Sequence, residues 1–315
     1  MPSRIVAIAR SRAALAAVFL VAGLVAGPRV ERFLSNLRVR VVKVSFEGPA
    51  NKALAGKVYY PASLLRRPRH GVLFCHGTLP DGKDTAFYRA LMKGLARRGY
   101  LVFGFDLRGF GKSPSISNIG RPVGLDFTAD AKAAIAYMTE QLPVRRDTLT
   151  IMGHSLGAAI AFATGATDER VANIIAISAG NFPSPGKYRE IDKRDYLAKI
   201  KRATGLDIPP REWDRMAGPL ALFQHLPLPA RKKVLIVLAD CDSKAVIDYN
   251  RRLYDELNVQ KDMLIIPDSN HNFGYEDFPG NERISEPPLR MLTQGIENWL
   301  DSICADPADA PPPAG

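Results

Sequence analysis

The chain has 315 residues, of which 46% are hydrophobic, enough to bury the core of one sizeable domain with an insertion. Its net charge is +11, but seven Arg and one Glu lie in the first forty residues, so only +5 is spread over the other 275. This modest remainder, without runs of basic residues interleaved with aromatic ones, argues against a nucleic-acid-binding protein.

The N-terminus has the layout of a targeting segment. Three arginines precede fifteen uncharged, mostly apolar residues over 13–27. Fifteen residues is short for a membrane span of about twenty, which favours a cleaved signal peptide. However, Pro28 directly after Gly27 disfavours cleavage there. We therefore predict a signal or membrane anchor and linker over 1–38, with the rest of the chain membrane-anchored, periplasmic or secreted.

From residue 39 onward the pattern predicts strands of two kinds. Val42, Val44 and Phe46 recur at every second residue, and the segment 54–60 is predicted to pair with them as an antiparallel hairpin. Short apolar runs then predict six further strands over 71–75, 100–105, 149–152, 171–177, 234–238 and 263–266.

Helical patterns lie between these strands. Asp84 is predicted to cap a helix that ends near Gly99, a second helix is predicted over 127–142, and an apolar stripe predicts a closing helix over 289–303. The alternation predicts an α/β fold with a mostly parallel, eight-stranded sheet and helices on both faces. The Pro- and Ala-rich tail over 305–315 is predicted to be disordered.

The run 149–152 leads directly into Gly153-His154-Ser155-Leu156-Gly157. The pattern Gly-x-Ser-x-Gly places a serine on a sharp turn from strand to helix, where the two glycines allow close approach. The pentapeptide is weak evidence by itself. The apolar strand before it and the small residues over 158–163 after it supply the expected context. Ser155 is therefore predicted to be an exposed nucleophile.

Polar segments follow four other predicted strands, at the sheet edge where open α/β sheets bind ligands. They begin with His76-Gly77-Thr78-Leu79, Asp106-Leu107-Arg108, Ala239-Asp240-Cys241-Asp242 and Pro267-Asp268-Ser269-Asn270-His271. Together with Gly-His-Ser-Leu-Gly, these segments resemble the α/β-hydrolase fold family over about 39–303. The resemblance implies that His76, His154, Asp106 and Arg108 brace loops.

A serine hydroxyl needs a base to act as a nucleophile at neutral pH. His271 follows the last predicted strand and gives the chain order Ser, Asp, His that the resembled family has. The resemblance implies an orienting carboxylate after 234–238, at Asp242, although Ala239 replaces the usual glycine of that turn. Asp240 stays open as the alternative acid.

The resemblance also implies an oxyanion hole formed by the backbone amides of Leu156 and Thr78. Because Thr78-Leu79-Pro80 replaces the glycine run of some lipases, Leu79 is an alternative to Thr78. The three cysteines form no CxxC pair, and no metal-ligand cluster, phosphate loop or dinucleotide motif competes with this site. No cofactor and no metal are predicted.

An insertion over about 181–230 separates two predicted strands, and roughly fifty residues are too many for a simple connection. Tyr196, Leu197 and Ile200 fall at helical spacing, followed by Trp213 and Met216, which predicts a small helical lid. Packing onto the domain is favoured for this stripe over lining an acyl pocket. The seven basic residues between 187 and 202 are interpreted as a solvated face rather than a contact with anionic lipid.

These observations predict an α/β-hydrolase domain over 39–304. Its predicted activity is that of a serine hydrolase, which cleaves a small-molecule carboxylic ester through an acyl-enzyme. The resemblance extends to enzymes like lysophospholipases, monoacylglycerol lipases and serine aminopeptidases. An acyltransferase or a serine peptidase with the same triad, or a non-catalytic binding protein of this fold, stays an alternative.

Overall fold

The computed structural model describes residues 39–61, 70–114, 126–182, 190–205, 207–208, 212–278, 281–284 and 286–304. Its main sheet contains the strands β1 (Arg40–Gly48), β2 (Lys52–Tyr60), β3 (Gly71–Cys75), β4 (Leu101–Phe105), β5 (Leu149–His154), β6 (Val171–Ile177), β7 (Lys233–Ala239) and β8 (Gln260–Ile266). Their spatial order is β1-β2-β4-β3-β5-β6-β7-β8. The pairs β1·β2 and β2·β4 are antiparallel, and the other neighbours are parallel. The predicted mostly parallel, eight-stranded sheet is confirmed.

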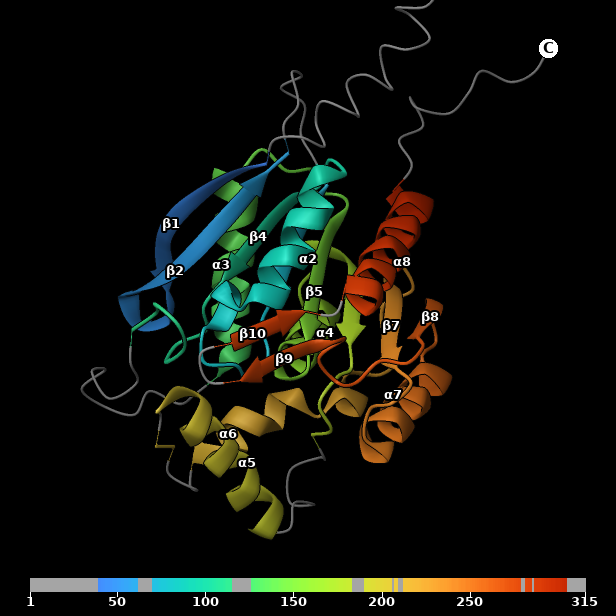
Figure 1. The fold of residues 1–315 in the computed structure, drawn as a ribbon. Helices are drawn as coiled ribbons and strands as arrows, with labels where there is room; N and C mark the ends of the chain where they lie inside the picture. The colour runs from blue at the N-terminus through green and yellow to red at the C-terminus, as the bar shows by residue number, and fades with distance from the viewer. Residues whose placement is uncertain are drawn as a thin grey trace, which may run out of the picture.

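Helices cover both faces of this sheet (Figure 1). The helices on the two faces are α2 (Ala86–Arg97), α3 (Phe127–Gln141), α4 (Leu156–Thr167), α7 (Lys244–Glu256) and α8 (Glu286–Cys304). Two further helices, α5 (Glu190–Thr204) and α6 (Trp213–Ala217), lie outside these faces. One buried apolar cluster joins the sheet to α3, α4 and α7, and a second joins it to α2 and α8. The sheet is therefore the middle layer of three, as the alternation of strands and helices predicts.

Two local predictions differ from the structure. Asp84 does not cap α2, because Thr85 holds the N-cap position and Asp84 ends a short 3-10 helix, Gly82–Asp84. The Asp84 carboxylate instead lies 2.5 Å from the Lys57 ammonium of β2. In addition, a small hairpin of β9 (Tyr275–Phe278) and β10 (Asn281–Ile284) follows β8, where no strand was predicted. The dipeptide Pro279-Gly280, which is typical of turns, separates the two strands in the sequence.

The insertion between β6 and β7 contains α5 and α6, which lie beyond the carboxyl ends of the parallel strands (Figure 1). The predicted stripe is mostly buried, with Leu197, Ile200, Trp213 and Met216 at most 9% exposed. The stripe thus packs against the domain, as favoured. That the insertion acts as a lid stays a prediction.

The predicted signal or anchor, its linker and the predicted disordered tail lie outside the described residues. Within the ranges that the structure does describe, each helix is too short or too polar to cross a membrane. Membrane anchoring through 13–27 therefore stays a prediction.

The turn from β5 into α4 depends on two glycines with no room for a side chain. A Cβ on Gly157 would clash with the backbone of Cys75 and His76, and a Cβ on Gly153 would clash with the backbone of Gly157. Backbone atoms inside a packed sheet have little freedom to move aside. The close approach of α4 to β3 and β5 therefore requires glycine at both positions.

Ser155, between these glycines, has a backbone conformation that L-residues rarely adopt, with φ 56° and ψ −117°. Such a residue stores strain of about 1–3 kcal/mol and persists only where its surroundings hold it. The Ser155 N–H donates to the Ile177 carbonyl over 2.9 Å, and the Ser155 carbonyl accepts from Gly180 over 3.1 Å. These two bonds tie the turn to the end of β6.

Gly157→Ala is expected to lower the free energy of unfolding by about 3 kcal/mol, because its methyl group overpacks a backbone contact. Chemical denaturation followed by circular dichroism measures this change. Gly94→Ala in α2 is the matched control, since its methyl group would meet only the side chain of Thr293. Equal stability of Gly157→Ala and wild type would contradict the close approach.

The free energy of unfolding of Ser155→Gly is expected to be about 1 kcal/mol higher than that of Ser155→Ala, because glycine relieves the strain of a positive φ. Both variants lack the hydroxyl, so the comparison isolates the backbone. Thermal and urea unfolding of the two proteins provide the measurement. A Ser155→Ala protein as stable as Ser155→Gly would show that the turn holds no strain.

Candidate active site

The register of the sheet brings the predicted loops together in pairs. Cys75 at the end of β3 lies beside Gly153 of β5, so the His76-Gly77 segment leaves the sheet next to the serine turn. Ala239 at the end of β7 lies beside Ile266 of β8. The two aspartates and His271 therefore lie on neighbouring loops at the same edge of the sheet.

The three predicted triad side chains meet at this edge. His271 Nε2 lies 3.0 Å from Ser155 Oγ, and His271 Nδ1 lies 2.7 Å from Asp242 Oδ2. The Asp242 side chain is 3% exposed, whereas that of His271 is 29% exposed. A carboxylate only accepts, so Nδ1–H donates to Asp242 and leaves Nε2 to accept from the serine hydroxyl. This is the arrangement that a general base needs.

The environment of Asp242 keeps its carboxyl group ionised. Burial opposes ionisation, but the hydrogen bond from His271 and the charge of that ring hold the pKa of Asp242 below its ordinary value. The Ser243 N–H also donates to Asp242 Oδ1 over 2.7 Å. A negative charge is therefore present beside His271 at neutral pH, where it favours an imidazolium.

Asp240, the alternative acid, occupies a different position. It is exposed, and its Oδ1 accepts from the Ser269 N–H over 3.1 Å. This bond is the main cause that lowers the pKa of the Asp240 carboxyl. Asp240 therefore ties its loop to the segment that carries His271, while Asp242 contacts the imidazole itself.

The predicted oxyanion amides lie on either side of the serine turn. Leu156 is the first residue of α4, where backbone N–H groups have no partner within the helix. On the other side, a Cβ on Gly77 would lie only 3.2 Å from Ser155 Cβ, so the segment that carries Thr78 lies against Ser155. The Leu79 N–H donates to the Gly77 carbonyl over 2.9 Å. That bond occupies the alternative amide and favours Thr78.

The loop-bracing residues are as expected from the resemblance. His76 Nε2 accepts from the Leu107 N–H over 3.1 Å. Asp106 Oδ2 lies 2.6 Å from the ammonium of Lys83, with both side chains buried. Arg108 pairs in the same way with Asp130 over 2.6 Å. The first two contacts join the loops after β3 and β4, and the third ties the loop after β4 to α3.

Two residues near the site escaped sequence reasoning. Asn250 of α7 is buried and clamps Ala179, donating to its carbonyl over 2.9 Å and accepting from its N–H over 3.2 Å. Ala179 directly precedes Gly180, which holds the serine turn. The second is Tyr88 of α2, whose hydroxyl bonds the ring of His154 over 2.9 Å. No motif marks either residue, because each acts through a partner far away in the sequence.

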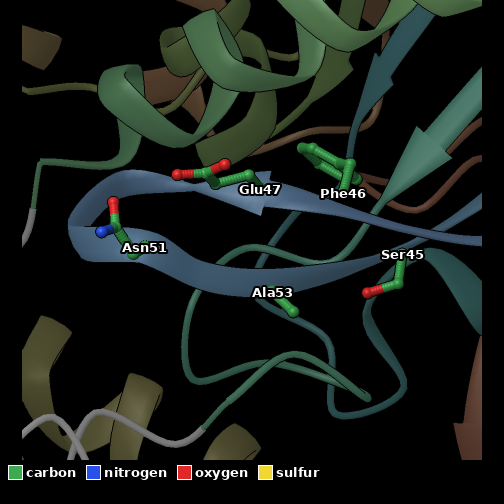
Figure 2. A pocket seen from close by; sticks show the side chains of 5 residues that line it. All are labelled: Ser45, Phe46, Glu47, Asn51 and Ala53. Atoms are coloured by element: carbon green, nitrogen blue, oxygen red, sulfur yellow. The ribbon is translucent and has the colours of Figure 1, made fainter.

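A surface hollow also lies on the β1–β2 hairpin at the edge of the main sheet (Figure 2). Its lining contains none of the predicted site residues and consists of Ser45, Phe46, Glu47, Asn51 and Ala53. We assign no function to this hollow.

Sequence comparison finds a family and a distant relative. A family model described as alpha/beta hydrolase fold matches residues 71–220, which include the serine turn. An uncharacterized protein of Mycobacterium tuberculosis is 37% identical over 90 residues. That match covers 29% of this chain and 29% of the relative, so the chain spans less than a third of the curated protein it matches.

Solved structures of the same architecture include several esterases and hydrolases. Est1E from Butyrivibrio proteoclasticus, solved with ferulic acid bound, has a TM-score of 0.61 at 15% identity, covering 84% of this chain and 100% of that one. An esterase domain from Rhodothermus marinus has a TM-score of 0.57 at 16% identity, covering 84% and 98%. XC6422 from Xanthomonas campestris, described as a serine hydrolase without lid, has a TM-score of 0.55 at 18% identity, covering 87% and 97%.

At identities of 15–18%, the similarity to these structures concerns the fold alone. The sheet order and the serine turn of this chain agree with the match to the family model. The chain therefore has the α/β-hydrolase fold.

Proposed function

We propose that the protein is a serine hydrolase that cleaves carboxylic esters through an acyl-enzyme. The observation that carries this proposal is the continuous contact from Asp242 through His271 to Ser155, over 2.7 and 3.0 Å. These three residues come from three separate loops, and their side chains would not be expected to meet in this order by chance. The family-model match over residues 71–220 and the esterases among the structural neighbours add further support.

Acylation follows from the direction of these hydrogen bonds. His271 Nε2 takes the hydroxyl proton as Ser155 Oγ attacks the carbonyl carbon of the ester. The carbonyl oxygen becomes negative and is stabilised by the amides of Leu156 and Thr78. Asp242 stabilises the imidazolium, which then gives its proton to the leaving alcohol. The products of this half-reaction are the free alcohol and an acyl group on Ser155.

Deacylation repeats these steps with water in place of the serine. His271 removes a proton from water, whose oxygen attacks the acyl carbon and forms a second oxyanion in the same amide site. Collapse of this intermediate returns the proton to Ser155 Oγ and releases the carboxylic acid. No further group is needed for the balance of atoms and charge.

The proposed substrate is a small-molecule ester, and the proposed lid is the insertion that carries α5 and α6. Tyr196 is the candidate to line the acyl site. Its ring contacts Phe182 and Trp213 edge-on, each over 5.3 Å between ring centres. Phe182 in turn lies beside Gly180, which bonds the serine turn. Attachment to a membrane through residues 13–27 is part of the proposal and concerns localisation only.

Substitution of the proposed acid is expected to separate the two aspartates. Asp242→Asn is expected to lower kcat by about 10,000-fold, because the neutral amide no longer favours the reactive tautomer and the imidazolium of His271. Asp240→Asn, in the same loop, is the matched control and is expected to stay within about threefold of wild type. Hydrolysis of p-nitrophenyl esters by the full chain measures both, after circular dichroism has shown that each variant is folded.

Labelling by a fluorophosphonate tests the nucleophile in the same preparations. Ser155→Ala is expected to abolish labelling and His271→Ala to slow it. A folded wild-type protein with neither labelling nor turnover would contradict the proposal and favour a binding role. Faster transfer of the acyl group to an added alcohol than to water would replace hydrolase by acyltransferase.

A further inference from the structure

A chain of hydrogen bonds runs behind the candidate triad through two buried rings. The Gly77 N–H donates to the Tyr88 hydroxyl oxygen over 3.0 Å. The same hydroxyl lies 2.9 Å from His154 Nδ1, and His154 Nε2 lies 2.8 Å from the backbone carbonyl of His271. Tyr88 belongs to α2, and His154 is the last residue of β5.

The His271 carbonyl, at one end of this series of hydrogen bonds, determines which group donates in each of them. The carbonyl of His271 only accepts, so His154 Nε2 must carry the proton. A neutral imidazole has one N–H, which leaves Nδ1 of His154 as an acceptor. Tyr88 therefore donates its hydroxyl proton to Nδ1 and accepts from Gly77 with its oxygen. Each donor and acceptor is used, and only one tautomer of His154 satisfies them all.

Burial makes this arrangement rigid. Tyr88 is 0% exposed and His154 is 1% exposed. Burial, followed by the nearby charge of His271, lowers the pKa of His154 to about 3, so this ring stays neutral at neutral pH. A fully satisfied polar network in a dry interior resists deformation, because breaking one bond leaves a buried group unpaired. Phe87 and Phe273 pack edge-on against the His154 ring over 5.6 and 6.0 Å between ring centres.

These hydrogen bonds join the three segments on which the proposed reaction depends. Gly77 precedes Thr78, a proposed oxyanion donor, and His154 precedes Ser155. The third segment carries His271, the proposed base. We propose that Tyr88 and His154 are positioning residues that hold the His271 backbone and the Gly77-Thr78 segment in register with Ser155. This inference rests on the proposed function.

Positioning of this kind acts on the rate rather than on ground-state binding. A misplacement of about 1 Å at a reacting group costs roughly 100-fold in rate. Tyr88 acts through the backbone of Gly77. His154 acts through the backbone of His271 and through its own ring, whose centre lies 4.9 Å from that of the His271 ring. The neutral His154 ring does not need to exchange protons. Loss of their polar atoms should therefore lower kcat and leave KM nearly unchanged.

Three variants of the full chain separate positioning from packing. Tyr88→Phe removes only the hydroxyl, and His154→Phe removes both ring nitrogens while keeping an aromatic ring. Each is expected to lower kcat for a p-nitrophenyl ester by about 10- to 100-fold at nearly constant KM. His154→Gln keeps an N–H that reaches toward the His271 carbonyl, so it is expected to restore at least a tenth of the wild-type kcat, about tenfold above His154→Phe.

Tyr100→Phe is the matched control for the loss of a tyrosine hydroxyl. Tyr100 is 5% exposed, and its hydroxyl donates to Asp301 over 2.6 Å, at α8 rather than at the triad. It is expected to lose stability but to keep kcat. Tyr88→Phe and His154→Phe proteins that lose stability and keep kcat, as Tyr100→Phe does, would overturn the inference.

A spectroscopic readout decides the inference without any turnover. The Nδ1–H proton of His271, held by Asp242, should give a low-field proton resonance in the resting protein. We expect this resonance in wild type and Tyr100→Phe, its broadening or shift in Tyr88→Phe and His154→Phe, and its return in His154→Gln. An unchanged resonance in His154→Phe would overturn the inference. A wild-type protein with the resonance but without ester turnover would instead contradict the proposed function.

Discussion

The close approach of α4 to β3 and β5 is the contact on which the rest of the site depends. Two glycines, Gly153 and Gly157, permit it, because a Cβ at either position would meet backbone. The chain can then reverse within one residue, which forces Ser155 into a positive φ and lifts its side chain beyond the strand ends. A strained residue at this place is stable only because Ile177 and Gly180 bond its backbone on both sides.

Parallel register explains how distant segments supply the other groups. Strands that run side by side release their loops at one edge, so residues separated by 116 positions, Ser155 and His271, meet at 3.0 Å. The fold then distributes the polar groups by burial. Asp242 is nearly buried and charged beside an imidazole, while the exposed Asp240 bonds a backbone N–H. Two aspartates two residues apart thus have different surroundings, and of these two only Asp242 contacts His271.

Much of the fold followed from the sequence because its central strands are continuous apolar runs, which is how a sheet buried on both faces reads. Contacts between side chains that lie far apart in the sequence could not be predicted in this way. Asp84 has the residue type of a helix cap, but its carboxylate pairs with the ammonium of Lys57 on β2. Tyr88 could not be predicted from the sequence either, because its hydroxyl contacts the ring of His154, which is 66 residues away. The serine and the histidine were predicted by motif and chain order, whereas the choice between Asp240 and Asp242 needed side-chain directions that a short turn does not encode.

The proposed reaction requires that Ser155 becomes acylated. The most direct measurement is mass spectrometry of the full chain mixed with an ester and quenched in acid within its first turnovers, followed by peptide mapping. If Ser155 is the nucleophile, an acyl mass increment appears on the peptide that contains Ser155 and is absent in Ser155→Ala. An increment on another residue, such as the exposed Cys241, or ester turnover that continues in Ser155→Ala, would rule out Ser155 as the nucleophile.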